Sequence, residues 1–121
     1  MLDDPQSFRS ENLPKYRWAT FFKELFEIYK DQPVNILADS DFLHIEPPQD
    51  KAPLTALQYD SHHGGLLKHR AQLVISTGGP EGETVTVDVP TIVWVYRELD
   101  GGPIGLEVID QENNRVVIRF A

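Results

Sequence analysis

The sequence predicts an α+β fold, in which one N-terminal amphipathic helix packs on a curved, mainly antiparallel sheet of about six or seven strands. Residues 14–30 place large apolar side chains with the helical period of about 3.6 residues, whereas most segments after Pro33 alternate apolar and polar residues as strands do. A helix with one apolar face must bury it, and the sheet offers the cover. A sheet rolled toward a barrel is one form of this fold.

The predicted helix has one wide apolar face. Successive residues turn by about 100°, and the apolar side chains within about 80° of Trp18 are Phe21, Phe22, Leu25, Ile28 and Tyr29, with Phe26 at the edge. Asn12 and Pro14 suit the start of a helix, and residues 31–33 suit its end. Because each large side chain gains roughly 1.5–3 kcal/mol on burial, we expect this face to lie in the core.

Strand-like segments follow one another from Val34 to the C-terminus. Residues 34–38 and 42–45 flank a polar turn and indicate a hairpin, whereas the prolines of residues 47–53 indicate a surface connection. Further strands are predicted at residues 54–59, 67–76, 84–89, 92–96, 106–108 and 116–120. Residues 92–96 are apolar at every position, so we expect this strand to be covered on both faces, with the helix on one of them.

The chain is long and apolar enough for one domain with its own core. It has 121 residues and a hydrophobic content of 40%, and the polar residues 1–13 read as an N-terminal arm before a single domain over residues 14–121. The absence of cysteine excludes disulfides and thiolate sites. Without a signal peptide or a long apolar segment in the sequence, we expect a soluble, cytoplasmic protein that does not insert into a membrane.

Charge argues against a nucleic-acid partner. The formal net charge is −8, which repels phosphate backbones unless basic residues cluster strongly. The densest basic patch is Lys68, His69 and Arg70, which is small. A protein partner is therefore the expectation.

Asp60, His62 and His63 form the sharpest polar group. Asp60 and His62 have the i, i+2 spacing of ligands on one strand face, and zinc commonly takes imidazole and carboxylate ligands. Adjacent histidines on a turn point in different directions, however, and a solvated polar turn needs no ligand. The group remains a candidate metal site beside the simpler interpretation of a surface turn.

Other patterns that often carry chemistry lack their required context. Gly78, Gly79 and Gly82 precede a strand rather than a helix, and no Lys-Ser or Lys-Thr pair follows, so a hairpin loop explains them better than a phosphate cradle. Serine, histidine and aspartate are present, but no nucleophile elbow places them. We therefore predict no catalytic residues and no cofactor.

Aromatic side chains are the remaining candidates for function. The chain holds more tryptophan and tyrosine than a small core easily buries, and such residues favour protein contacts when half-exposed. Tyr16 and Phe26 at the helix margins, with Tyr59 and Trp94 on the strands, are the candidate contact residues. The alternative is that they are core residues whose polar tips reach the surface.

These observations favour a non-enzymatic accessory or protein-interaction module. Two alternatives stay open. One is a metal- or small-ligand-binding protein that uses Asp60, His62 and His63. The other is a structural protein that forms homo-oligomers through a free sheet edge.

Residues 18–120 also resemble a small bacterial family known only as a domain of unknown function. The similar segments are the helix with Trp18, Phe21 and Phe22, the segment of Leu54, Leu57, Tyr59 and Asp60, the strand of Pro90, Ile92 and Val95, and the segment of Leu106, Glu107, Val108 and Asp110. The family often has histidine where Val89 stands and a charged turn where residues 61–65 stand. The resemblance implies a bacterial protein and supplies no reaction, substrate or cofactor.

Overall fold

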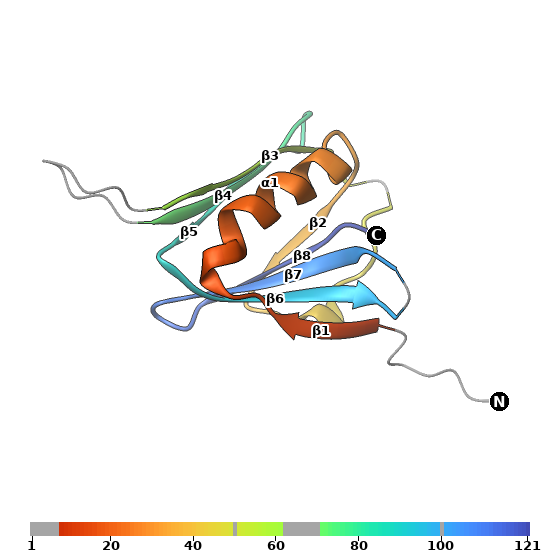
Figure 1. Cartoon of the computed structure of the whole chain (residues 1–121). Helices are drawn as coiled ribbons and strands as arrows, with labels where there is room; N and C mark the ends of the chain where they lie inside the picture. Colours follow the sequence, from red (N-terminus) through yellow and green to blue (C-terminus); the bar gives the residue numbers. More distant parts are fainter. Residues whose placement is uncertain (1–7, 50, 62–70, 100) are drawn as a thin grey trace, which may run out of the picture.

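The computed structural model describes residues 8–49, 51–61, 71–99 and 101–121. It contains one helix, α1 (Trp18–Tyr29), and two antiparallel sheets (Figure 1), which confirms the α+β class. The larger sheet has the order β1 (Phe8–Asn12), β6 (Pro90–Glu98), β7 (Pro103–Asp110), β8 (Arg115–Arg119) and β2 (Asn35–Ala38). The smaller sheet has the order β3 (Leu54–Asp60), β4 (Gln72–Thr77) and β5 (Thr84–Asp88).

The prediction of six or seven strands in one rolled sheet is wrong, because eight strands form two sheets that do not close into a barrel. The chain changes sheets between β5 and β6 at Val89, whose φ of 53° is rare for a β-branched residue. Val89 N donates to Ala71 O at 2.8 Å, and Gln111 N donates to Val89 O at 3.1 Å, which holds this corner. On the other side the segment before β2 joins the start of β3 through a bridge between Pro33 and Pro53 and through hydrogen bonds such as Leu54 N to Gln32 O at 2.8 Å.

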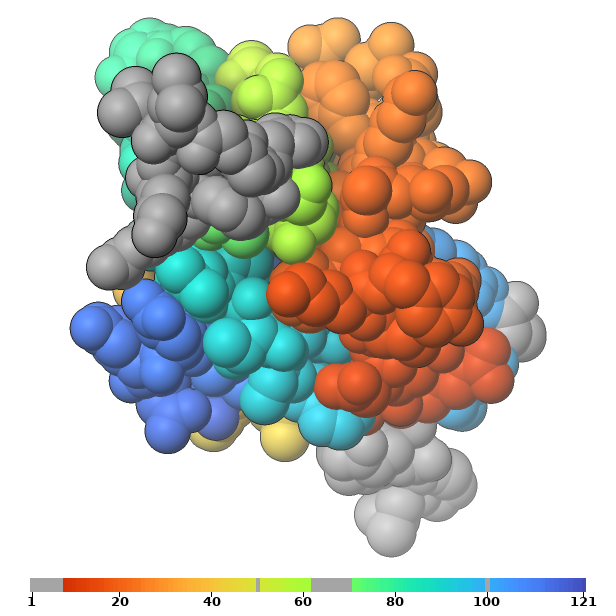
Figure 2. All heavy atoms as spheres, turned by 60° about the vertical axis from the view of Figure 1, so that its left-hand side comes forward, coloured from red at the N-terminus to blue at the C-terminus, as the bar shows by residue number. Residues whose placement is uncertain are grey.

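Helix α1 fills the space between the two sheets, and its apolar face lies in the core as predicted. Its buried residues are Trp18, Phe21, Phe22 and Leu25. They join one cluster with side chains of both sheets, including Leu57 of β3 and Val93 and Val95 of β6. The helix packs mainly along β3, as the neighbouring orange and yellow-green atoms of Figure 2 show. Ile28, expected on this face, is 54% exposed because it lies at its margin.

Residues 8–13 are part of the folded domain rather than of a polar arm. Strand β1 pairs with β6, and Leu13 is buried in the core. Arg97 Nε donates to Glu11 Oε1 at 2.6 Å, and this hydrogen bond lowers the pKa of Glu11. The segment looks polar because an edge strand leaves many of its side chains in water. Asn12 belongs to β1 and does not cap α1, whose start carries no side-chain cap.

The predicted hairpin of residues 34–38 and 42–45 is also wrong. Strand β2 pairs with β8, and residues Phe42–His44 form a short 3₁₀ turn, η2. Phe42 is buried and its ring stacks on Tyr96 with centroids 4.3 Å apart. Together with Ile45, Ile104 and Val117 it forms a second apolar cluster. We call the face of the larger sheet that carries Tyr96 and lies opposite α1 the outer face, and η2 covers part of it.

Strand β7, rather than β6, is the strand that is covered on both faces. Its six residues from Ile104 to Ile109 are all buried. In β6, Val93 and Val95 are buried, but Ile92 is 37% exposed and Trp94 is half-buried. The reason is sheet order: β6 has the edge strand β1 as one neighbour, whereas β7 lies at the centre of the larger sheet.

Candidate functional site

Trp94 lies on the outer face of the larger sheet, beyond the part that η2 covers. The register places it between Asn12 of β1 and Glu107 of β7. The neighbouring row of the ladder joins Ile92, Ile109 and Arg115. Directly paired residues of antiparallel strands share a face, so these side chains form one patch. We call the patch of Asn12, Ile92, Trp94, Ile109 and Arg115 the Trp94 face.

Glu107 lies on this face of the sheet too, beside Trp94. It is 5% exposed and is the one charged residue that is buried in the described part of the chain. The Tyr96 hydroxyl donates to Oε1 at 3.0 Å, and Arg115 Nε lies 3.2 Å from Oε2 in an ion pair. A buried carboxylate is costly unless it is paired, and here each oxygen has a partner. The network therefore links β6, β7 and β8 beside the half-buried Trp94.

Tyr96 is held in place by aromatic rings as well as by Glu107. Phe42 stacks on it at an interplanar angle of 9°, and Phe8 meets it edge-on at 6.0 Å. Burial, followed by the negative charge of Glu107, raises the pKa of Tyr96 well above its ordinary value. The hydroxyl therefore keeps its proton and serves as a lasting donor to the carboxylate.

We expect the Tyr96→Phe variant to lose less stability in alkaline solution than the wild-type protein. The raised pKa of Tyr96 gives stability that is full below the ordinary tyrosine pKa, about 10, and is lost as the pH rises toward the folded value. The free energy of unfolding, measured with urea between about pH 9 and pH 11, should therefore fall less steeply for Tyr96→Phe. Some pH dependence of the unfolding free energy should remain in Tyr96→Phe, because burial also raises the pKa values of Tyr29 and Tyr59.

Tyr16→Phe is the matched control for this measurement, because Tyr16 is 86% exposed and lies far from Glu107 in the fold. Its slope should equal that of the wild-type protein. Equal slopes for wild type and Tyr96→Phe would contradict the coupling between Tyr96 and Glu107.

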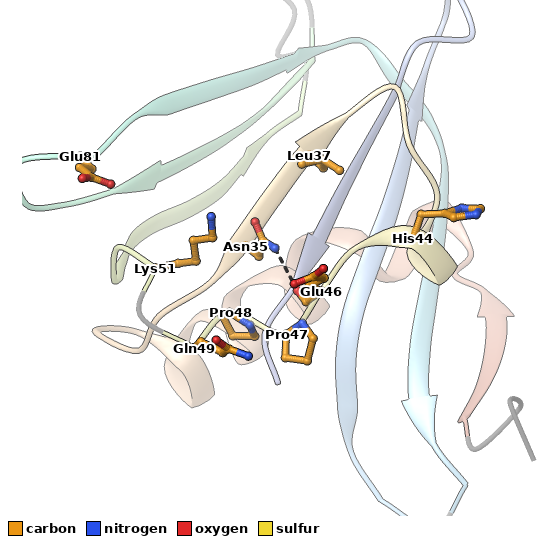
Figure 3. A pocket seen from close by; sticks show the side chains of 9 residues that line it. All are labelled: Asn35, Leu37, His44, Glu46, Pro47, Pro48, Gln49, Lys51 and Glu81. Atoms are coloured by element: carbon orange, nitrogen blue, oxygen red, sulfur yellow. Dashed lines mark hydrogen bonds between the residues drawn. The ribbon is translucent and has the colours of Figure 1, made fainter. Parts of the chain in front are cut away.

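A second feature lies beside β2. A hollow of about 560 Å³ opens between this strand, the segment that follows η2 and the loop after β4 (Figure 3). Its lining residues are Asn35, Leu37, His44, Glu46, Pro47, Pro48, Gln49, Lys51 and Glu81. Asn35 Nδ2 donates to the backbone oxygen of Glu46 at 3.0 Å, which holds the two walls together at this point. His44 Nδ1 lies 2.7 Å from Asp41 Oδ1, and this contact lowers the pKa of Asp41.

The predicted metal site is described only in part. Asp60 ends β3 opposite Gln72, whereas His62 and His63 lie outside the described residues. Within residues 8–49, 51–61, 71–99 and 101–121, no three His, Cys, Asp or Glu side chains are grouped to hold a metal ion. The hypothesis that Asp60, His62 and His63 bind a ligand stays a prediction.

The four predicted contact residues do not form one surface. Tyr16 is exposed in the 3₁₀ turn η1 (Lys15–Arg17) before α1. Phe26 and Tyr59 line a shallow hollow of about 320 Å³ between α1 and β3, where the ring of Tyr59 packs against Trp18 and Phe22. Trp94 stands apart, on the outer face of the larger sheet.

The sequence interpretation missed the network around Glu107 and the hollow beside β2. One signal was present for the first: Glu107 interrupts the run Ile104–Ile109 in a strand that is otherwise apolar on both faces. A carboxylate in such a strand requires donors from neighbouring strands. No sequence pattern marked the second, because its walls come from three separate segments.

Comparison with known proteins gives no relative: neither a family model, nor a curated protein, nor a solved structure matches this chain. The resemblance to a domain of unknown function therefore stays a prediction. In the described portion of the chain, no helix has the length and apolar character that crossing a membrane requires.

Proposed function

We propose that this protein is a non-enzymatic protein-interaction module and that the Trp94 face is its contact surface. The observation that carries the proposal is Trp94 itself, a large aromatic side chain left half-exposed on a sheet, beside the exposed Ile92 and Arg115. Tryptophan and arginine are enriched where protein contacts contribute most to affinity. The rest of the face adds apolar area and one amide to the same patch.

The rigidity of this surface supports the same function. Trp94 stands on β6, which is paired on one side with β1 and on the other with β7. The carboxylate of Glu107 holds Arg115 through an ion pair with Nε. A contact surface that is already ordered loses little conformational entropy when a partner binds.

The contacts of Glu107 agree with a role in supporting the Trp94 face. One oxygen of Glu107 accepts from Tyr96 and the other pairs with Arg115, and the raised pKa of Tyr96 keeps its hydroxyl protonated. A general base must reach the proton that it abstracts, and Glu107 is only 5% exposed. The network therefore suits a platform better than a proton-transfer site.

The test compares Trp94→Ala with Leu99→Ala. Leu99 is 56% exposed in the turn after β6, so its variant loses a similar kind of surface group away from the Trp94 face. Proteins captured by the wild-type chain from its own cells would be measured by quantitative mass spectrometry. A partner that uses this surface should be retained by Leu99→Ala and lost by Trp94→Ala, with affinity falling by about 30-fold or more.

Urea unfolding of both variants would show whether the fold survives the change. The proposal fails if Trp94→Ala remains folded and captures the same proteins at the same level. It also fails if the wild-type chain captures no reproducible partner.

A further inference from the structure

The outer edge of β2 presents backbone groups that have no partner in the described part of the chain. Asp39 N donates to Arg115 O at 2.8 Å, which fixes which residues of this strand bond to β8. Because bonded pairs alternate in an antiparallel ladder, Asn35 and Leu37 bond to β8, whereas the N–H and C=O groups of Ile36 and Ala38 point away from it. The described residues supply no hydrogen bond to these outward groups.

A slot begins at the same edge. The bridge between Pro33 and Pro53, with a hydrogen bond from Val34 N to Ala52 O at 3.2 Å, joins β2 to the start of β3 at one end. Beyond this point the two segments separate, and Figure 3 shows Lys51 and Glu81 facing β2 across the opening. The slot is therefore closed at its Pro33 end and open toward Ala38.

Two adjoining hollows, which share Asn35, Leu37, Lys51 and Glu81, lie along this edge. The hollow of about 560 Å³ on the outer face touches Asn35 and Leu37. A smaller one, of about 180 Å³, also touches Val34 and Ile36, together with Ala52 and Thr77. An added strand points alternate side chains to opposite faces, so one set would enter the larger hollow and the other set the smaller.

The charges around the slot select the occupant. Its described ionisable walls are Glu46, Glu81 and Glu83 against one lysine, Lys51, with His44 at the outer end. An acidic groove attracts a basic segment. It disfavours a second copy of this chain, since pairing two β2 edges would bring the same glutamates of both copies together.

We propose that β2 binds an extended, basic peptide segment of a partner protein by strand addition. The outward groups of Ile36 and Ala38 bond to the backbone of the peptide. Its lysine or arginine side chains enter the larger hollow near Glu46 and Glu81, and its apolar side chains enter the smaller hollow near Ile36. This site is separate from the Trp94 face, so either can fail without the other.

The probe is a fluorescent peptide of about eight residues that alternates lysine and valine, measured by fluorescence anisotropy. Two N-methylated forms of the peptide are compared with it. One carries methyl groups on the backbone nitrogens of the valines, and the other carries them on the backbone nitrogens of the lysines. Alternate residues of a strand bond to opposite edges, so one methylated form should bind like the parent and the other should lose about tenfold or more in affinity. This comparison leaves the protein unchanged.

Protein variants distinguish the contribution of the β2 backbone edge to peptide binding from the contribution of the acidic side chains of the slot. Ala38→Pro removes an outward N–H while leaving the bonds to β8, and should weaken the parent peptide by about tenfold or more. Glu81→Lys combined with Glu83→Lys should weaken it and favour a peptide that alternates glutamate and valine. Glu24→Lys combined with Glu112→Lys is the matched control, because it changes net charge equally at exposed positions outside the slot. Trp94→Ala should bind the peptide normally.

Several results would overturn the proposal. Equal binding of both methylated peptides would reduce the effect to charge attraction, as would equal losses in the two double variants. If the parent peptide does not bind at a concentration of about 1 mM, the slot is not a binding site for such a peptide. A dimer in light scattering that Ala38→Pro dissociates would assign the edge to a second copy of this chain instead.

Discussion

The Trp18→Ala variant will lose about 3–5 kcal/mol of the free energy of unfolding, the range typical of a fully buried large aromatic residue. Trp18 is 1% exposed, and its ring meets Tyr59 edge-on with centroids 5.5 Å apart. Its Nε1 donates to Leu13 O at 2.9 Å, so the variant also leaves a buried carbonyl without this donor. Because Trp18 joins α1, β3 and the end of β1, the loss affects both sheets.

Urea unfolding followed by far-UV circular dichroism measures this effect. Tyr16→Ala is the matched control: it also truncates an aromatic residue near the start of α1, but at an 86% exposed site, and should stay within about 0.5 kcal/mol of wild type. Trp18→Phe keeps a ring and should lose an intermediate amount. Similar losses for Trp18→Ala and Tyr16→Ala would show that α1 does not depend on this contact.

The Gly105→Ala variant will be destabilised by about 1–3 kcal/mol, and more if the backbone cannot shift, as overpacked cores are. A Cβ atom at Gly105 would come within 2.8 Å of the backbone oxygen of Ile118, and it would overlap the ring of Phe42. That ring stacks on Tyr96, so the variant must displace η2 from the outer face. We expect a weaker near-UV circular dichroism signal together with the lower stability.

Gly102→Ala is the control, because an added Cβ there meets no atom within 4 Å. Replacing a glycine at an unstrained position should leave stability unchanged or raise it slightly. Equal effects of the two substitutions would mean that Phe42 does not rest on Gly105. The comparison thus tests the packing of η2 directly.

The helix was the most predictable element, and its physical reason is local. Trp18, Phe21, Phe22 and Leu25 lie on one face of any helix with this sequence, and a face of that size has to be buried. Strand β5 was predictable for a similar reason, since its alternation of valine with threonine marks one buried face. These elements need no knowledge of their partners.

The elements that the sequence misassigned are those whose form depends on a distant partner. Residues 8–12 become strand β1 only because β6 offers an edge for pairing. Phe42 lies in a 3₁₀ turn rather than in a strand because Gly105, far along the chain, leaves room for its ring. A local pattern carries no record of such contacts.

The candidate sites show the same division. Trp94 was named from the sequence as a contact residue, because a surplus of large aromatic residues implied that some would reach the surface. The network of Glu107 beside it was not predicted from the sequence, because Glu107 meets Tyr96 and Arg115 only when three strands are paired in register. The slot beside β2 likewise needs three segments placed around one edge.

The sequence by itself determined the α+β class, the buried face of the helix and the net charge of −8. These depend on residue type and local periodicity, which are properties of the chain alone. Only the tertiary structure decided that the eight strands of the described residues divide into two sheets and that Glu107 is buried with both oxygens paired. It also decided that no described strand pairs with the outer edge of β2. The physical reason is that pairing register and burial are set by contacts between segments distant in sequence.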